Sequence, residues 1–188
     1  SIPLLHVLSE IDRSIPVYFL NTGYHFPETI LFKEEITELL GINVIDLTSN
    51  VPKLLQKNHI GNLLFTSNPT YCCYLNKTQP LEPIIAKMDV WISGVRAQQN
   101  ANREQLDIEE ETPDGTIRFH PILNWSSKMI WEYRQKYNLP NHPLEERGYF
   151  SVGCEPCTQA VLDNMERGGW WKGMNKTECG LHTDLIKK

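Results

Sequence analysis

The sequence predicts an α/β fold with a mostly parallel sheet and helices on both of its faces. Short apolar segments with strand character alternate with longer segments of helical periodicity, a pattern typical of parallel strands connected by helices. Polar segments, 21–25 and 93–96, come at the ends of two expected strands, where ligands bind in this architecture. At 188 residues, the chain is long enough for one core with an appended tail.

The expected helices have identifiable ends, and the expected strands are short apolar runs. Ser1 and Ser126 are predicted N-caps, and Gly41 is predicted to end the second helix. In chain order we expect a helix over 1–11, a strand over 16–20, a helix over 26–40, a strand over 43–47, a helix over 78–88, strands over 89–95 and 116–122, a helix over 126–137 and a short helix over 158–162. The acidic segment 109–115 is expected to be a solvent-exposed loop.

The composition argues against several functional classes. A net charge of -5 disfavours a broad nucleic-acid surface, so an anionic ligand would depend on a few local cations. The apolar stretches are too short for a transmembrane helix, and no pattern typical of a secretion signal is present. Five cysteines, an odd number, favour a reducing compartment, and we expect the protein to be cytoplasmic.

Four of the cysteines form two close pairs, Cys72-Cys73 and Cys154-Glu-Pro-Cys157. Such pairs could hold zinc or a [4Fe–4S] cluster, or they could be buried core thiols beside a coincidental Cys-x-x-Cys. Adjacent side chains point to opposite faces of a strand or diverge around a helix, which makes the tandem pair awkward ligands for one tetrahedral zinc. A cluster has separate irons, so the tandem pair favours a cluster over zinc.

The fifth cysteine, Cys179, lies alone near the C-terminus in Lys176-Thr-Glu-Cys-Gly-Leu-His182. A nucleophilic thiol needs a depressed pKa, and Lys176 or His182 could supply the positive charge that lowers it. An unreactive surface cysteine in a tail is the alternative. The pattern therefore indicates a candidate reactive thiol, separate from the paired cysteines.

Five segments resemble the assimilatory adenylyl-sulfate reductases, members of the phosphoadenylyl-sulfate reductase family. The resemblance is collinear and covers nearly the whole chain. The segments are 19–29, Cys72-Cys73 with Lys77 and Pro80-Leu81, Trp91-Ile-Ser-Gly-Val-Arg96 with Gln99 and Arg103, Gly148-Tyr-Phe-Ser-Val-Gly-Cys-Glu-Pro-Cys-Thr158, and Glu178-Cys-Gly-Leu-His182. The last segment is a highly specific signature of this family. The resemblance implies an adenine nucleotide alpha-hydrolase-like fold.

The resemblance also implies a reaction, the reduction of adenylyl sulfate to sulfite and AMP in assimilatory sulfate reduction. The Cys179 thiolate would attack the sulfate sulfur and form an S-sulfocysteine as AMP leaves. A thioredoxin-like thiol would then release sulfite. A [4Fe–4S] cluster on Cys72, Cys73, Cys154 and Cys157 would act structurally and electrostatically. With these four cysteines occupied, no second free thiol remains in the sequence, so an external reductant is expected; a homo-oligomer is also possible.

The substrate-binding residues implied by the resemblance are cations around the phosphosulfate and a polar strand end near the adenine or ribose. They are Lys77, Arg96, Arg103, Arg167, His182, Asn21, Thr22 and Gly23. Taken singly, each cation is more often a member of a surface ion pair, and residues 21–23 also fit an ordinary strand-to-helix turn.

Two features depart from the family pattern. Members begin with a strand and a Ser/Gly-rich phosphate loop before the first helix, and we expect both to be missing here, with Ser1 as the last residue of that loop. Trp170 stands where members usually carry a second arginine, so one anion contact is expected to be lost or supplied elsewhere. We expect residues 1–163 to form an α/β domain that binds nucleotide and cluster, and 164–188 to form an irregular tail with the catalytic cysteine.

Three other functions stay open. A phosphoadenylyl-sulfate reductase would accept a 3′-phosphate, although members of that group commonly lack the four paired cysteines. A nucleotide- or metal-binding module without turnover is consistent with the missing loop and with Trp170. A sulfur-transfer enzyme acting on tRNA shares the fold class, but the acidic balance weighs against it.

Overall fold

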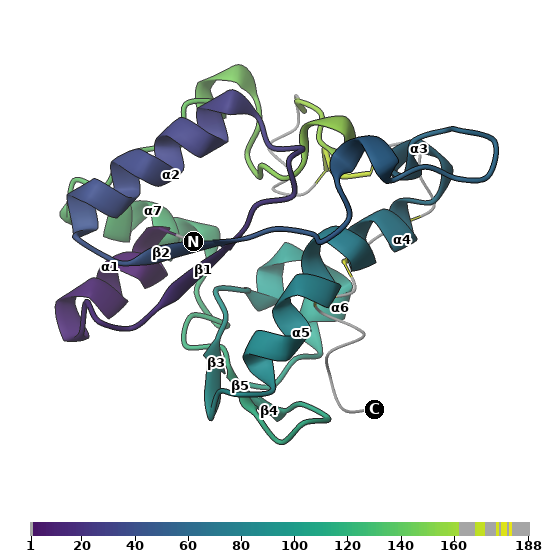
Figure 1. Cartoon of the computed structure of the whole chain (residues 1–188). Coiled ribbons are helices and arrows are strands. Elements are labelled where there is room, and N and C mark those ends of the chain that lie inside the picture. The colour runs from purple at the N-terminus through teal and green to yellow at the C-terminus, as the bar shows by residue number, and fades with distance from the viewer. Residues whose placement is uncertain (1, 162–167, 172–175, 177, 180, 182–188) are drawn as a thin grey trace.

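The computed structural model describes residues 2–161, 168–171, 176, 178, 179 and 181 (Figure 1). Within them, the α-helices are α1 (Ile2–Ile11), α2 (Pro27–Leu40), α3 (Leu64–Ser67), α4 (Pro69–Cys73), α5 (Gln79–Ile85), α6 (Ala101–Glu104) and α7 (Ser127–Lys136). The strands are β1 (Val17–Leu20), β2 (Val44–Leu47), β3 (Val90–Ile92), β4 (Glu109–Glu111) and β5 (Ile117–Phe119). A π-helical turn covers Tyr74–Thr78, and single 3₁₀ turns cover Lys53–Leu55, Ala97–Gln99, Glu145–Arg147 and Glu155–Cys157.

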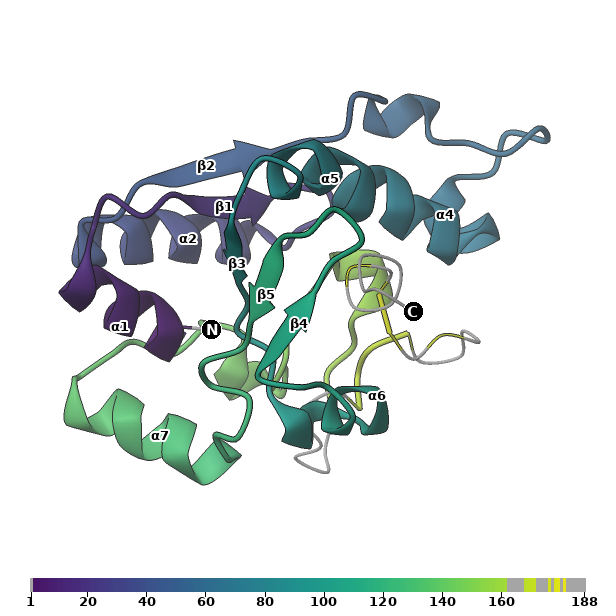
Figure 2. The ribbon, with the colours of Figure 1, turned by 90° about the horizontal axis from the view of Figure 1, so that it is seen from below.

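The strands form two small sheets in which most neighbours are parallel. β1 pairs in parallel with β2, and β3 pairs in parallel with β5. β4 adds to the outer side of β5 as an antiparallel strand (Figure 2). The predicted fold class, an α/β fold with mostly parallel strands, is confirmed.

The β1–β2 pair is covered by helices on both faces. Val17 and Val44 are register partners, as are Leu20 and Leu47 three residues further on, so the two pairs point to opposite faces. On the first face lie α1 and α2, with contacts from Ile2, Leu5, Phe32, Ile36 and Leu40. On the second face lies α5, with contacts from Leu81 and Ile85, which also reach Trp91 of β3. α5 therefore joins the two sheets into one core.

Two predicted helix ends are present in the structure. Gly41 adopts a left-handed conformation with φ 60° and ends α2, a position for which glycine is favoured. The Ser126 side chain accepts a hydrogen bond from the Met129 N–H at 3.2 Å and begins α7. The N-cap predicted at residue 1 lies outside the described residues.

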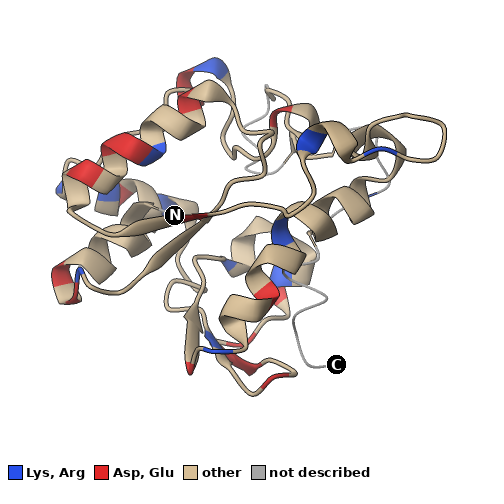
Figure 3. Cartoon of the chain, in the orientation of Figure 1, with Lys and Arg blue, Asp and Glu red and all other residues tan. Residues whose placement is uncertain are grey.

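The prediction of a loop over 109–115 is wrong for its first three residues. Glu109–Glu111 form β4, and Glu110 lies directly opposite Arg118 of β5. The Glu110 carboxylate lies 3.6 Å from the guanidinium of Arg118, whose side chain is fully buried. Figure 3 shows the acidic β4 beside the basic charge of its neighbour. An acidic run can therefore form a strand here because a buried arginine neutralises its central carboxylate.

The short helix predicted over 158–162 is also absent from its described part. The helical turn there is the single 3₁₀ turn Glu155–Cys157, and Thr158 is extended with φ -130° and ψ 130°. Thr158 instead forms a β-bridge with Trp170. Within the described part of the chain, we find no helix with the length and apolar character needed to cross a bilayer.

Candidate active site in a cysteine-lined pocket

The tandem cysteines end α4, and the helix continues through the π-helical turn into α5. Pro80 and Pro83 lie in the first turns of α5 and have no backbone N–H, so two ordinary i→i−4 hydrogen bonds cannot form there. A π-helical turn changes the direction of the side chains that it carries. Asn76 and Lys77 lie in this turn and line the same pocket as the tandem cysteines.

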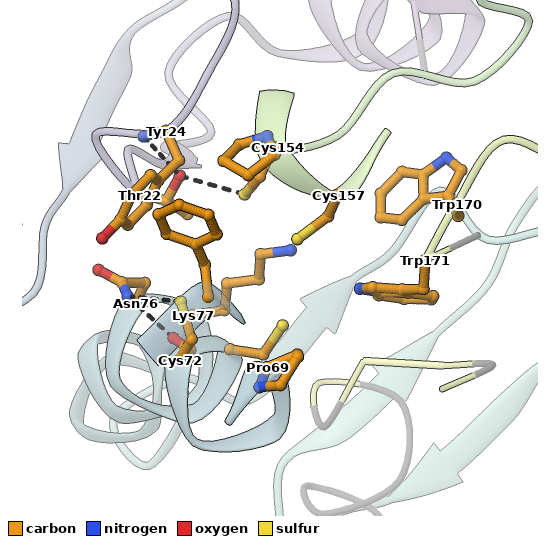
Figure 4. Close-up of a pocket in the computed structure, with 13 residues that line it drawn as sticks. Thr22, Tyr24, Pro69, Cys72, Asn76, Lys77, Cys154, Cys157, Trp170 and Trp171 are labelled. Carbon is orange, nitrogen blue, oxygen red and sulfur yellow. Dashed lines mark hydrogen bonds between the residues drawn. The ribbon is translucent and has the colours of Figure 1, made fainter. Parts of the chain in front are cut away.

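The pocket collects side chains from four parts of the chain (Figure 4). Backbone pairing brings these parts together: Cys154 forms a β-bridge with His25, which follows β1, and the Trp171 N–H donates to the Cys157 carbonyl at 2.9 Å. The residues predicted from the sequence that line it are Thr22, Cys72, Cys73, Lys77, Cys154 and Cys157. Both members of each cysteine pair thus border one space at the carboxyl end of β1.

The paired cysteines contact other residues in two groups. Cys72 packs in one cluster with Cys154, and Cys73 packs in another with Cys179, while Cys157 contacts both clusters. Cys72 and Cys73 diverge because neighbours on a helix are rotated by about 100°. Among the described residues, no three His, Cys, Asp or Glu side chains lie close enough together to hold one metal ion.

Polar groups lie beside two of the paired sulfurs. The Thr22 hydroxyl is 3.3 Å from Cys154 Sγ, and the Asn76 amide donates to Cys72 Sγ at 3.6 Å. Burial, followed by the negative charge of nearby sulfurs, raises the pKa of Cys72 to about 11. Burial also raises the pKa of Cys157. Burial therefore disfavours the thiolate form of Cys72 and of Cys157.

Lys77 is a pocket-lining cation that faces these sulfurs. Burial acts to lower the pKa of Lys77. The negative charges of Cys154, Cys179 and the other pocket sulfurs together outweigh burial, so the pKa of Lys77 is raised. The Lys77 ammonium also lies 5.7 Å from the centroid of the Trp170 ring. Lys77 therefore keeps a positive charge on the wall that the cysteines share.

Cys179 adjoins the pocket through its contact with Cys73. The Cys179 side chain is buried, and a hydrogen bond with Cys73 is the main cause that lowers the pKa of Cys179 to about 6. Burial opposes this shift, whereas the charges of Lys77 and Lys176 support it. This hydrogen bond and these charges favour the thiolate of Cys179, the form in which a thiol is nucleophilic.

The two predicted arginines within the described residues are buried and bound to protein groups. Arg96 donates to the Trp125 carbonyl at 3.2 Å and to the Ser127 hydroxyl at 3.4 Å. Arg103 forms an ion pair with Glu178 at 2.8 Å. Neither side chain lines the cysteine pocket. Whether they bind substrate stays a prediction.

Residues 21–23 divide between the pocket and the surface. Thr22 is buried and lines the pocket. Asn21 donates to Asp46 at 2.9 Å, and the Gly23 carbonyl accepts a hydrogen bond from Lys53. Two further predicted substrate ligands, Arg167 and His182, lie outside the described residues.

Sequence reasoning missed two residues that organise this region. Glu178 was part of a recognised motif, but its partners Arg103 and Asn100 lie more than seventy residues away, and no local pattern reports such a contact. Asn76 was missed because one asparagine in a helix carries no signal until the cysteine beside it is known to be buried.

Together, these features define an α/β protein with a thiol-based site at the carboxyl ends of its parallel strands. The chain belongs to the phosphoadenosine phosphosulfate reductase family, since residues 1–160 match the model of the phosphoadenosine phosphosulfate reductase domain. The predicted family is therefore confirmed.

Curated relatives carry two related names. The adenosine 5'-phosphosulfate reductase of Bacillus cereus (strain Q1) is 38% identical over 182 residues, which cover 95% of this chain and 78% of the relative. The phosphoadenosine 5'-phosphosulfate reductase of Gloeobacter violaceus is 35% identical over 187 residues, covering 97% and 78%.

Solved structures share the fold at lower identity. The phosphoadenylyl-sulfate reductase from Candida auris, crystallised as a phosphate complex, aligns with a TM-score of 0.69 at 21% identity, covering 85% of this chain and 77% of that one. The FMN adenylyltransferase from Candida glabrata aligns with a TM-score of 0.55 at 14% identity, covering 93% and 54%. These likenesses support the fold alone.

Proposed function

We propose that this chain reduces adenylyl sulfate to sulfite and AMP, with Cys179 as the nucleophile. Membership of the family and the names of its relatives support an oxidoreductase that acts on a sulfur group in sulfate assimilation. The observation that carries the role of Cys179 is its buried position in contact with Cys73, where the positive charges of Lys77 and Lys176 favour its thiolate. A thiolate next to a cation is the arrangement needed to attack a negatively charged sulfate ester.

In the first step, the Cys179 thiolate donates an electron pair to the sulfate sulfur. The sulfur–oxygen bond to the phosphate breaks, AMP leaves with that electron pair, and Cys179 carries the sulfonate as an S-sulfocysteine. Lys77 offsets negative charge near this centre. In the second step, an external dithiol, such as a thioredoxin-like protein, attacks Cys179 Sγ and releases sulfite. Its second thiol resolves the mixed disulfide, so the dithiol is oxidised by two electrons and Cys179 is regenerated.

Cys72, Cys73, Cys154 and Cys157 are the proposed ligands of a [4Fe–4S] cluster. A mononuclear zinc needs its four sulfurs grouped tetrahedrally around one ion, and among the described residues no three such donors are placed to hold one metal ion. Ligands that border one pocket from separate directions fit a cluster better, because each sulfur binds a different iron. When bound, the cluster would supply electrostatic stabilisation beside Lys77, and its ligands would tie α4 to the 154–157 turn.

The test of the reaction is a comparison of wild-type protein with the Cys179→Ser variant. Wild-type protein incubated with adenylyl sulfate, radioactive in its sulfur, should retain the label after denaturation, and a dithiol should release it as sulfite. Cys179→Ser should retain no label and produce sulfite more than 10³-fold more slowly, since removal of a covalent nucleophile leaves only binding and charge effects. A labelled Cys179→Ser variant would contradict the assignment.

The preferred nucleotide is tested in the same assay. We expect faster sulfite production from adenylyl sulfate than from its 3′-phosphorylated form. One relative is named for the phosphorylated nucleotide, and a preference for that substrate would reassign the specificity without changing the chemistry.

The cluster is tested on protein purified without oxygen. Four irons and four inorganic sulfides per chain, with broad visible absorption, are expected for the wild type. Cys154→Ala should lower the iron content, whereas Cys179→Ser should leave it unchanged. One zinc per chain and no iron would contradict the proposal.

A further inference from the structure

The carboxylate of Glu178, the residue directly before Cys179, is buried among hydrogen-bond donors from the start of α6. Its side chain is only 3% exposed. Arg103 donates to both carboxylate oxygens, from Nε at 2.8 Å and from Nη2 at 3.3 Å. The Asn100 amide donates to the same group at 2.8 Å. The fork of an arginine on a carboxylate defines orientation as well as distance.

The same carboxylate also binds the backbone of Cys179. The Cys179 N–H donates to Glu178 Oε1 at 3.0 Å. One oxygen of Glu178 therefore joins the backbone of the reactive cysteine to the guanidinium of Arg103. A shift of this carboxylate would move the peptide unit that carries Cys179.

The donors are themselves attached to the segment that follows β3. The Asn100 side chain accepts from the Arg103 N–H at 2.9 Å and caps α6. Gln99 accepts hydrogen bonds from the Arg103 guanidinium and, at 3.1 Å, from the Arg96 N–H. This chain of contacts connects the segment after β3 to Cys179 through side chains that are buried or partly buried.

We propose that Glu178 and Arg103 form a positioning pair that holds the Cys179 thiol against Cys73 and Lys77. This inference deepens the proposed function and rests on it for its kinetic consequence. A buried ion pair is weak evidence for stability, because desolvation offsets much of its attraction. Its value here is geometric, since a misplacement of about 1 Å at a reacting atom can cost on the order of 10²-fold in rate.

The proposal changes the role expected for Arg103. A guanidinium that bound the phosphosulfate would affect the affinity for nucleotide, whereas a guanidinium that acts through Glu178 affects the rate of the chemical step. The two roles separate in a single-turnover experiment that measures the dissociation constant of adenylyl sulfate and the rate of S-sulfocysteine formation independently.

The test uses full-length Glu178→Gln, Arg103→Gln and the double variant, with Arg134→Gln as the matched control. Arg134 forms a 2.9 Å ion pair with Glu145 in another part of the fold. For both single variants, we expect S-sulfocysteine formation to slow by about 10–100-fold, with the nucleotide dissociation constant within about twofold of wild type. Arg103→Lys, which keeps the charge and loses the fork, should be intermediate.

A second readout does not depend on the reaction. Cys179 is 5% exposed, and mass spectrometry can follow its alkylation by iodoacetamide separately from that of the other cysteines. We expect alkylation of Cys179 to be at least fivefold faster in Glu178→Gln and unchanged in Arg134→Gln. If wild-type protein formed no S-sulfocysteine, the proposed function would fail while this measurement still tested the pair.

The double variant distinguishes a loss of positioning from a loss of folding. It removes both buried charges together, so it avoids the unpaired charge that each single variant leaves, and it should be folded by circular dichroism. The positioning role is overturned if Arg103→Gln weakens nucleotide binding tenfold with an unchanged rate of S-sulfocysteine formation. It is also overturned if the double variant keeps both the reaction rate and the alkylation rate of wild type.

Discussion

Lys77 and Arg118 are both interior cations that lie near an indole ring, yet the structure neutralises them differently. Arg118 is fully buried, faces the Glu110 carboxylate at 3.6 Å and lies 4.8 Å from the centroid of Trp91. Lys77 is partly buried, lies 5.7 Å from the centroid of Trp170, and faces sulfur atoms. Within the described residues, no ion pair joins Lys77 to a carboxylate.

The difference separates a structural charge from one that we propose acts in the reaction. The Arg118 charge is compensated inside the fold, so it can serve the sheet without a ligand. Among the residues that the structure describes, the Lys77 charge faces sulfurs and forms no ion pair with a carboxylate, which is the arrangement expected where charge develops during a reaction.

The largest expected effect on stability is that of Arg118→Met. The substitution keeps an apolar stem and leaves the Glu110 carboxylate without its buried partner, which typically costs about 3–5 kcal/mol. Urea unfolding followed by circular dichroism measures the loss. The double variant Arg118→Met/Glu110→Gln should recover much of the stability, because neither charge then remains. A double variant no more stable than Arg118→Met would show that the guanidinium acts through other contacts.

Lys77→Met should leave the fold intact and slow the reaction. Removal of one group that stabilises developing negative charge typically costs about 10²–10³-fold in kcat, and we expect a loss of this size in sulfite production. The matched control is Lys136→Met, since Lys136 also lies over an aromatic ring, 5.0 Å from the centroid of Tyr137. The comparison with Arg118 would break down if Lys77→Met lowered the unfolding free energy more than the activity.

The elements that the sequence predicts well are those with local signals. Gly41 and Ser126 mark their helix ends through their own backbone and side-chain chemistry. β4 was not predicted because three consecutive glutamates lack the alternation of polar and apolar residues typical of a strand. Its stability comes from Arg118 on the neighbouring strand. The missing helix over 158–161 has a similar cause, since Thr158 is held extended by Trp170.

The same division applies to the candidate site. The motifs identify Cys72, Lys77 and Cys154 as candidates, and the fold brings all three to one pocket. The pairing of Arg103 with Glu178 spans 75 residues, and no local pattern in the sequence indicates it. Residue chemistry in a motif was predictable, whereas the partner of each charge was not.

A smaller effect is expected from Gly153→Ala, at the wall beside Lys77. A Cβ at Gly153 would lie 2.5 Å from the Trp170 indole, so the ring that lies near the Lys77 ammonium must shift. Overpacking of this kind typically costs about 1–3 kcal/mol, measurable by urea unfolding. When Gly153→Ala is added to Trp170→Phe, the unfolding free energy should fall by less than when it is added to wild type, because the smaller ring leaves room for the Cβ. Equal losses in both backgrounds would mean that the clash is not with this indole.

The smallest effect concerns His120, which lies beside the Arg118–Glu110 pair and is fully buried. Burial, and then the charge of Arg118, lower the pKa of His120 despite the opposing charge of Glu110. The unfolded chain therefore binds a proton at a higher pH, near 6.5, than the folded chain does. The stability that neutral His120 contributes is complete above about pH 6.5 and declines as the pH falls toward the folded pKa, by at most about 1.4 kcal/mol per pH unit.

We expect the unfolding free energy of His120→Gln to fall less steeply between pH 6.5 and 5 than that of wild type. The variant should keep part of the slope, because burial also lowers the pKa of His25 and of His142. Only the slope is diagnostic, since the substitution can change the stability at every pH. Parallel curves for the two proteins would mean that His120 is protonated alike in the folded and unfolded states. The charge of Arg118 would then have no effect on the pKa of His120. Arg118 would differ still more from Lys77, whose charge acts on several sulfurs.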